Sequence, residues 1–389
     1  MRVQKSGSLH VLVLASLCWS AAAGCGHLGG GAASDDTIDI GALVYQTGPL
    51  AQKGATDNIT MAADDVNAAG GVDGRKVKIK FYDIGGLTPQ QGRTAAQRAL
   101  ADEPDALIGP SVSAQTNAFL GLLPKAEVPL INVSAQRESD PGQPQGNPWT
   151  FRIYHRVDRM AEAISRVVAE RLKAKNVVVT HSTDDTSTHV KDDVVKGLKA
   201  KGITVARTAS YTPEATDLTN AALATRGADA VVALGYPQPL GLMVKQMRAN
   251  GIRLPIVFDP GAEAGVKLLS PGDLANTSLV AACRPQATRD RDPAAKKFMD
   301  DYTREHPGSY VNGYYYEAVK LIAEGVKNAK SLEGPKLREG LASIKGFKGV
   351  CGESTADADQ NFIHDYKIVK LDGGRESLGG VVSGLTEAY

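Results

Sequence analysis

The sequence predicts an α/β protein with two doubly wound lobes, each a parallel sheet covered by helices, and three observations carry this prediction. The chain has 389 residues, which is more than one ordinary core accommodates. Residues 38–83 read as one strand–loop–helix–turn–strand unit. Apolar strand-like runs and amphipathic helical runs then alternate in two successive series, and such alternation is typical of parallel sheets.

The first unit has clear boundaries between its elements. Its apolar run at 38–44 suits a buried strand and is broken by Thr47-Gly48-Pro49. Apolar residues then recur at helical spacing over 59–69, and Gly70-Gly71 ends that helix. Residues 77–82 alternate between apolar and polar side chains, which predicts a strand with one buried face.

The same alternation predicts the remaining elements of both lobes. Further strands are expected at 106–109, 130–133, 150–154, 176–180, around Val205, 230–234, 256–259 and 366–371. Further helices are expected at 88–101, 115–123, 158–173, 188–202, 217–226, 239–250, 294–306 and 312–329. Each series supplies roughly five strands, and sheets of this kind bind ligands beyond the carboxyl ends of their strands.

Residues 1–24 predict an export signal. Arg2 and Lys5 precede a mostly apolar run, and small residues lead up to Cys25. This arrangement resembles a bacterial lipoprotein signal, so we expect a lipid on Cys25 and a glycine-rich, flexible tether over 25–36. The alternative is cleavage after an Ala-x-Ala site, which leaves Cys25 as a spare thiol. We therefore expect an exported chain that is anchored by lipid alone, at the cell surface or in the periplasm.

Composition and missing motifs narrow the class of protein. The net charge is +1 and charged residues make up 22% of the chain, which gives no argument for a nucleic-acid partner or an anionic membrane surface. The sequence has no P-loop, no Gly-x-Ser-x-Gly, no His-Glu-x-x-His and no Cys-x-x-Cys. We therefore expect no catalytic residues, no metal and no cofactor.

The residues of the first unit narrow the prediction to a family. Gln46-Thr-Gly-Pro-Leu-Ala-x-x-Gly54 is followed by Asp65-Val-Asn-Ala-Ala-Gly-Gly-Val-x-Gly-Arg-Lys-Val77. Both segments resemble the branched-chain amino-acid (Leu/Ile/Val) type of periplasmic substrate-binding protein, the type I two-lobe receptors of ABC importers. The resemblance covers about residues 37–375. It implies a Venus-flytrap fold with a multi-strand hinge, and an ABC permease as the membrane partner.

The resemblance also implies how the chain is divided between the lobes. The N-terminal lobe is expected to contain residues 37–155 and 285–349, and the C-terminal lobe residues 156–284 and 350–389.

Two cysteines of the exported part remain, Cys283 and Cys351. In an oxidising compartment they fit either one disulfide or two separately buried thiols. The resemblance places both near the hinge, which favours the disulfide.

The first lobe is expected to hold a ligand carboxylate. Ser111 and Ser113 lie where a strand ends and a helix begins, so their hydroxyls and the unpaired backbone N–H groups suit an anion, although capping of the helix also explains them. The resemblance puts Ser113 at a carboxylate-binding serine, and Ser134 and Gln136 in the second carboxylate loop. Gln136 replaces the Thr or Ser that is common there.

The second lobe contributes candidates for the rest of the ligand. Tyr236 follows a strand and matches a cleft-facing tyrosine. The acidic partner of the ligand ammonium aligns with Gly261, so Asp259 or Glu263 would replace it after a shift in register. Thr186 lies where the family has Tyr-Gly.

One residue of the first lobe differs from the family pattern, and this difference leaves the class of ligand open. Lys53 replaces an aromatic residue that covers the ligand side chain. Lys53 either pairs with an anionic ligand or points outward as a surface lysine. The resemblance implies uptake of a branched-chain or related amino acid. The alternatives are a receptor for a non-amino organic acid or amide solute, and a sensory surface lipoprotein without a transporter.

Overall fold

The structure is a computed structural model, and it describes residues 37–48, 51, 53–134, 147–263, 265, 269–371 and 375–385, apart from the side chains of Asp185 and Thr186. The expected signal at 1–24, the tether at 25–36 with Cys25, and the candidate Gln136 therefore lie outside the described residues.

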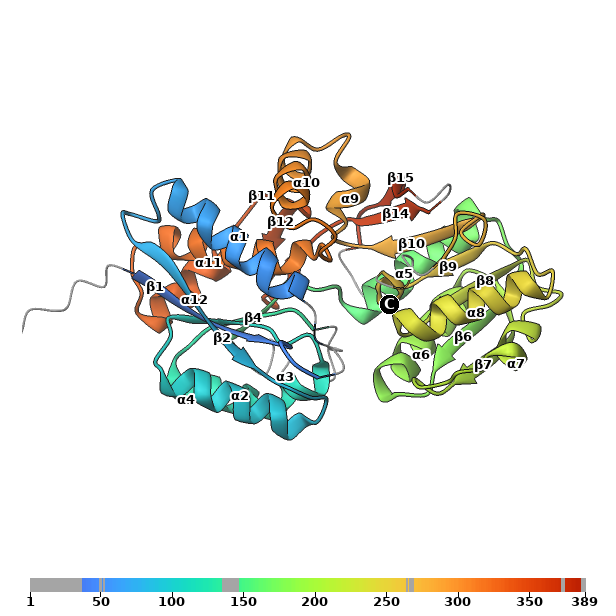
Figure 1. The fold of residues 1–389 in the computed structure, drawn as a ribbon, viewed down its shortest axis with the longest axis horizontal. Helices are drawn as coiled ribbons and strands as arrows, with labels where there is room; N and C mark the ends of the chain where they lie inside the picture. The colour runs from blue at the N-terminus through green and yellow to red at the C-terminus, as the bar shows by residue number, and fades with distance from the viewer. Residues whose placement is uncertain are drawn as a thin grey trace, which may run out of the picture. The chain divides into compact units, whose positions relative to one another are not determined.

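The first lobe contains a parallel sheet with helices on both faces (Figure 1). In the described part of the chain its strand order is β2-β1-β3-β4-β5, with every neighbouring pair parallel. The strands are β1 (Thr37–Val44), β2 (Lys76–Asp83), β3 (Ala106–Ile108), β4 (Leu130–Asn132) and β5 (Thr150–Arg152). The predicted strands of this lobe are therefore all present.

Two apolar clusters hold helices against the two faces of this sheet. One face packs against α1 (Lys53–Ala68), α10 (Pro293–Glu305), α11 (Gly313–Ala329) and α12 (Gly334–Ala342). The other packs against α2 (Pro89–Ala101), α3 (Ser113–Phe119), the short η1 (Leu120–Leu122) and α4 (Leu123–Ala126). Helix α2 begins as its sequence predicts, because Thr88 and Gln91 form a reciprocal capping box.

The second lobe contains a larger, mixed sheet. Its order in the described residues is β15-β14-β10-β9-β8-β6-β7. The strands are β6 (Asn176–Ser182), β7 (Thr204–Tyr211), β8 (Ala230–Leu234), β9 (Ile256–Phe258), β10 (Thr277–Ala281), β14 (Tyr366–Lys370) and β15 (Ser377–Val382). Strands β14 and β15 run antiparallel to their neighbours. About five parallel strands were predicted, and the short β10 was missed together with β15, whose Gly379 and Gly380 weaken its strand pattern.

Helices also cover both faces of the second sheet. One apolar cluster includes α5 (Val157–Arg166), η2 (Val167–Arg171) and α6 (Asp185–Ala200). The other includes α7 (Thr219–Leu223), α8 (Pro237–Ala249) and η3 (Pro260–Ala262). Ala287 of α9 (Pro285–Thr288), which directly follows the hinge segment at 282–284, also packs against this cluster. The doubly wound arrangement predicted for both lobes is confirmed.

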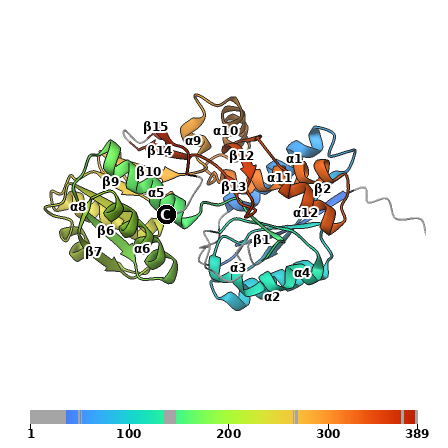
Figure 2. The same cartoon turned by 180° about the vertical axis from the view of Figure 1, so that it is seen from behind.

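A hinge of several segments joins the lobes. In the described residues the chain passes between them at 153–156, 282–284 and 364–365, next to the small sheet of β11 (Phe347–Gly349), β12 (Gly352–Ala356) and β13 (Phe362–Ile363) (Figure 2). The buried Arg152 at the end of β5 donates to Oδ1 of Asn361 from Nε at 2.9 Å. This bond joins the end of β5, which leads into the first passage, to the residue before β13, which leads into the third.

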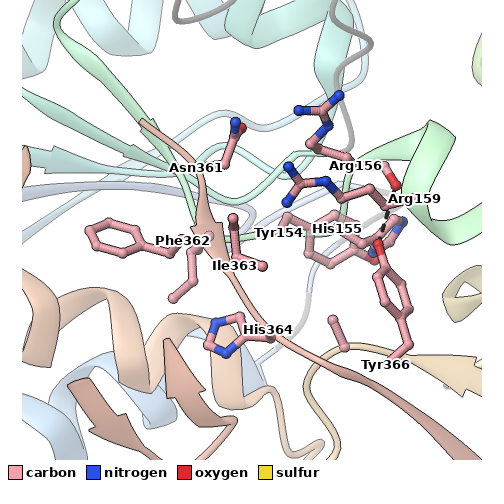
Figure 3. A pocket seen from close by; sticks show the side chains of 11 residues that line it. Tyr154, His155, Arg156, Arg159, Asn361, Phe362, Ile363, His364 and Tyr366 are labelled. Atoms are coloured by element: carbon pink, nitrogen blue, oxygen red, sulfur yellow. Dashed lines mark hydrogen bonds between the residues drawn. The ribbon is translucent and has the colours of Figure 1, made fainter. Parts of the chain in front are cut away.

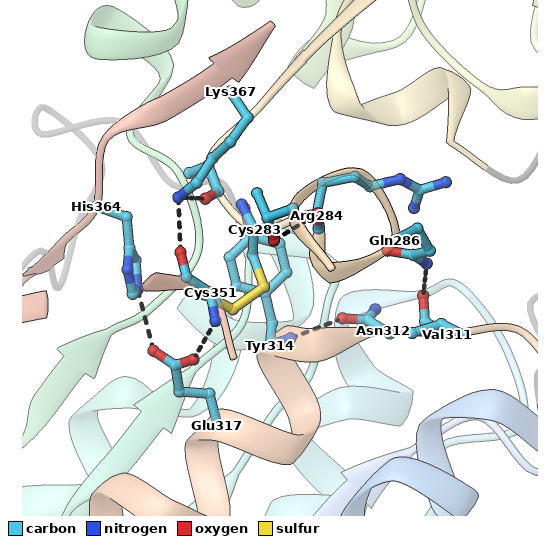
Figure 4. The surroundings of a disulfide bond; sticks show 12 residues. Cys283, Arg284, Gln286, Val311, Asn312, Tyr314, Glu317, Cys351, His364 and Lys367 are labelled. Carbon is cyan, nitrogen blue, oxygen red and sulfur yellow. Dashed lines mark hydrogen bonds and ion pairs between the residues drawn. A yellow bond between two sulfur atoms is a disulfide. The ribbon is translucent and has the colours of Figure 1, made fainter. Parts of the chain in front are cut away.

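A disulfide between Cys283 and Cys351 links the second passage to the loop before β12 (Figure 4). Two buried ionisable side chains hold the backbone of Cys351 beside it. Lys367 donates to the Cys351 carbonyl at 2.6 Å, and Glu317 accepts from the Cys351 N–H at 2.8 Å. Burial lowers the pKa of Lys367 and raises that of Glu317. The bridge implied by the resemblance is therefore present and enclosed.

The packing of β12 and β13 bears on the lobe boundary. Val350, Cys351, Ala356 and Phe362 belong to the apolar cluster of the first lobe. The expected boundary lay at residue 350, and we propose instead that the last passage into the second lobe follows Phe362.

Candidate ligand-binding site

A cavity of about 200 Å³ is lined by loops of both lobes. First-lobe residues on its wall are Tyr45, Ala55, Ser111, Val112, Val133, Tyr154, Tyr310, Asn312, Tyr314 and Tyr315. Second-lobe residues are Tyr236, Pro237, Pro260, Gly261 and Glu263. Several of these directly follow the carboxyl ends of β1, β4, β8 and β9, which is where sheets of this type place their ligand sites.

The first-lobe wall contains a cluster of neutral hydroxyl groups. Ser111 lies close enough to the hydroxyls of Tyr45 and Tyr315 to lower the pKa of each, against the larger effect of burial. The Tyr45 hydroxyl also donates to Oε1 of the buried Gln115. Burial raises the pKa of Tyr315 to about 12 although Ser111 nearby lowers it, so these groups stay protonated at neutral pH. This wall can donate hydrogen bonds to an anion without carrying a charge.

Two tyrosines close the cavity on its hinge side. The rings of Tyr154 and Tyr314 pack with centroids 4.7 Å apart at 59°. The Tyr314 hydroxyl accepts from the N–H of Cys283 at 3.1 Å. The hinge side of the cavity is therefore hydrogen-bonded to the backbone of a cysteine of the disulfide.

The second-lobe wall carries the charged group of the cavity, Glu263. The buried Arg284 donates from Nη1 to Oε2 of Glu263 at 3.1 Å. Arg284 also donates from Nε to Glu376 at 2.7 Å and makes a second bond to that carboxylate from Nη2. Burial raises the pKa of Glu263, and Arg284 acts in the opposite direction.

Two further acids lie near Glu263. Asp259 precedes the lining residue Pro260, and burial raises its pKa to about 8. Asp259 accepts from the N–H of Gly235 at 3.4 Å. Asp184 accepts from the Tyr236 hydroxyl at 3.3 Å. The second-lobe side of the cavity is therefore acidic.

Three of the predicted site residues meet at this cavity. Ser111, Tyr236 and Glu263 line it, and Asp259 lies just behind its wall. Gly261, the aligned position of the family acid, also lines it but has no side chain to bind a cation.

The other candidates lie elsewhere. Ser113 is half-buried at the start of α3 and is not among the lining residues. Ser134 is buried, and its hydroxyl donates to Oδ1 of Asn132 at 2.7 Å. Lys53 is exposed beside a separate hollow with Asp57 and His306. The side chain of Thr186, within α6, and the whole of Gln136 lie outside the described residues.

The sequence interpretation missed most of the aromatic wall. Tyr310, Asn312, Tyr314 and Tyr315 reach the cavity because the chain returns to the first lobe through α10 and α11. The run Gly313-Tyr-Tyr-Tyr316 at the start of a helix was the available signal, but a helical stripe of aromatics more often faces a core.

The described residues give no sign of a metal centre or a membrane span. None of their His, Cys, Asp and Glu side chains form a group of three or more that could hold a metal ion. None of their helices is both long and apolar enough to cross a bilayer.

A much smaller pocket lies in the hinge and is not a solute site. It is lined by His155 and His364 of the first and third passages and by Arg159 of α5, among others (Figure 3). Its volume is about 20 Å³, which is room for one water molecule. It shares only Tyr154 with the wall of the larger cavity.

Known proteins share this architecture. Residues 37–376 match the family model described as periplasmic binding protein. The leucine-, isoleucine-, valine-, threonine- and alanine-binding protein of Pseudomonas aeruginosa is 25% identical over 312 residues, which is 79% of this chain and 82% of that protein.

Solved structures share the fold. A branched-chain amino acid transporter substrate-binding protein from Streptococcus pneumoniae, in complex with isoleucine, is 26% identical with a TM-score of 0.79, covering 90% of this chain and 100% of that one. A solute-binding protein from R. palustris in complex with benzoate is 16% identical with a TM-score of 0.77, covering 91% and 97%. The second likeness concerns the fold alone.

Proposed function

The chain belongs to the periplasmic binding protein family, and from this premise we propose that it is the extracytoplasmic solute-binding component of an ABC importer, with an α-amino acid as its ligand. The cavity between the lobes is the ligand site. The family is one of binding proteins, which agrees with the lack of any catalytic motif in the sequence.

The observation that carries this proposal is the difference between the two walls of the cavity. Ser111 and Tyr315 offer neutral hydroxyls on one side, and Glu263 offers a carboxylate on the other. An α-amino acid has a carboxylate and an ammonium group and therefore complements both walls. A simple organic acid would bring a second negative charge toward Glu263, which is unfavourable in a partly desolvated site.

Lys53, with Gln136 and the displaced family acid, was an argument for an anionic or amide ligand, and the position of Lys53 weakens that alternative. Lys53 is exposed and lines a hollow that shares only Tyr310 with the cavity wall. The named ligands of the relatives, branched-chain and small amino acids, agree with the amino-acid proposal.

We further propose that binding is coupled to closure of the lobes about the hinge. Closure removes water from the cavity, which strengthens the hydrogen bonds and charge pairs to the ligand. A ligand that contacts both walls favours the closed form, which an ABC permease would then receive. Export through residues 1–24 and a lipid on Cys25 would hold the receptor near such a permease.

Thermal unfolding of the purified mature chain with a panel of amino acids and monocarboxylates tests the proposed function. A ligand at a hundredfold excess over its dissociation constant should stabilise the fold by about 2.7 kcal/mol, which is a readily measured rise in Tm. At least one amino acid should produce it. If monocarboxylates raise Tm and amino acids do not, the organic-acid alternative is correct and the amino-acid proposal is wrong.

A further inference from the structure

We propose that Tyr310 and Arg284 make Glu263 a strut across the cavity, which links the first lobe, the second lobe and the hinge before any ligand binds. This inference rests on the proposed function, because it assigns the two residues that orient the group expected to receive the ligand ammonium. The strut is one hydrogen-bonded chain in the order Tyr310, Glu263, Arg284, Glu376.

Tyr310 is fixed to the first lobe through its backbone. Its carbonyl accepts from the Tyr302 hydroxyl at 2.9 Å and from Nδ2 of Asn58 at 3.3 Å. Helix α1 approaches so closely that a Cβ on Gly54 would lie 2.1 Å from the same carbonyl oxygen. The backbone of Tyr310 therefore moves with α1 and α10.

The side chain of Tyr310 leaves the first lobe and reaches the second. Its hydroxyl donates to Oε2 of Glu263 at 2.7 Å. Glu263 follows η3 at the end of β9, so this bond joins the two walls of the cavity directly. Hydrogen bonds to an ionised acceptor are stronger than those between neutral groups.

Arg284 fixes the other end of the strut in the hinge. It belongs to the passage at 282–284 and is 2% exposed. Its planar fork binds Glu376 through two nitrogens and Glu263 through the third, at 3.1 Å. Two carboxylates around one guanidinium leave a net charge of −1, so the group as a whole still attracts a cation.

Both donors use the same oxygen of Glu263. Tyr310 and Arg284 bind Oε2, whereas Oε1 is buried with no hydrogen-bond partner among the described residues. A buried carboxylate oxygen without a donor is costly. A ligand ammonium can supply that donor without breaking the strut, so the ligand completes an arrangement that already joins the lobes.

The variant Tyr310→Phe tests the strut because it removes one hydroxyl and keeps the ring. Small-angle X-ray scattering of the ligand-free mature chain measures whether the lobes separate. We expect a larger radius of gyration than in the wild type, and an amino-acid dissociation constant about tenfold higher, as for one lost charge-assisted bond. The ligand-saturated variant should be as compact as the wild type.

Tyr316→Phe is the matched control. The Tyr316 hydroxyl also binds a carboxylate, that of Asp65, but both groups belong to the first lobe. This control should leave the radius of gyration and the affinity unchanged. An unchanged ligand-free radius of gyration in Tyr310→Phe would overturn the strut, and this measurement needs no ligand, so it stands apart from the test of the proposed function.

The variant Arg284→Lys tests the hinge end. A lysine ammonium is a compact charge and cannot bind two carboxylates in the fork geometry of arginine. We expect amino-acid affinity to fall about tenfold while the chain stays folded, as circular dichroism would show. Wild-type affinity in Arg284→Lys would contradict the positioning role of Arg284.

Discussion

The two walls of the cavity are built on the same kind of sheet edge, but their chemistry differs. The first-lobe wall presents hydroxyl groups that stay neutral across the physiological range. The second-lobe wall presents buried acids whose pKa values are raised by burial. The comparison teaches that one fold can supply a neutral wall for the carboxylate and an acidic wall for the ammonium of a zwitterion. We expect only the acidic second-lobe wall to change its charge with pH.

The largest effect should come from removing the charge of the second-lobe wall. In Glu263→Gln the ligand ammonium loses its ionic partner inside a desolvated site, which typically costs 2–5 kcal/mol. We expect the amino-acid dissociation constant, measured by calorimetry, to rise about a hundredfold. Glu305→Gln is the control, because Glu305 is exposed and does not line the cavity. Equal losses in both variants would show that Glu263 has no special role.

The next effect concerns stability and pH. Burial raises the pKa of Asp259 from 3.8 to about 8, so the folded chain keeps a proton that the unfolded chain releases near pH 4. The folded state binds more protons over this interval, and the contribution of Asp259 to stability therefore falls as pH rises from about 4 to about 8. A variant without an ionisable group at this position should not show this loss of stability at high pH.

We expect Asp259→Asn to gain about 4 kcal/mol of stability relative to the wild type between pH 5 and pH 9. Urea unfolding at the two pH values measures the difference. The exposed Asp64→Asn serves as control. A variant that is equally stable relative to the wild type at both pH values would refute the raised pKa.

How much of the site the sequence predicts depends on whether its residues lie next to a predicted strand or are brought together from distant parts of the chain. Ser111 and Tyr236 lie directly after strands, and the strand pattern placed them correctly at the cavity. Arg284 and Glu376 are 92 residues apart, so no local pattern indicates their pairing. Ser134 also follows a strand, but Asn132 turns its hydroxyl inward, which only the packed structure reveals.

The strands of the fold likewise differ in how well the sequence predicts them. Parallel strands between helices have strong apolar runs and were predicted almost throughout. The antiparallel β15, with its glycine pair, lacks such a run. Its place in the sheet comes from antiparallel pairing with the preceding strand β14, and no apolar run in β15 indicates that pairing.

The smallest effect should come from the neutral wall. Ser111→Ala removes one hydroxyl and should raise the amino-acid dissociation constant about fivefold, which corresponds to about 1 kcal/mol. Calorimetry at several pH values should give the same ratio throughout, because no ionisable group is lost. Ser113→Ala provides the comparison, and the larger effect should be at Ser111. A larger effect at Ser113 would favour the residue implied by the family resemblance.

The division of labour between the walls can be tested most directly by calorimetry of the mature chain with three matched ligands. Leucine has both charged groups, 4-methylpentanoate lacks the ammonium, and 3-methylbutylamine lacks the carboxylate. If the ligand is an aliphatic amino acid that needs both walls, leucine should bind at least a hundredfold more tightly than either analogue. Binding of 4-methylpentanoate as tight as that of leucine would contradict the account.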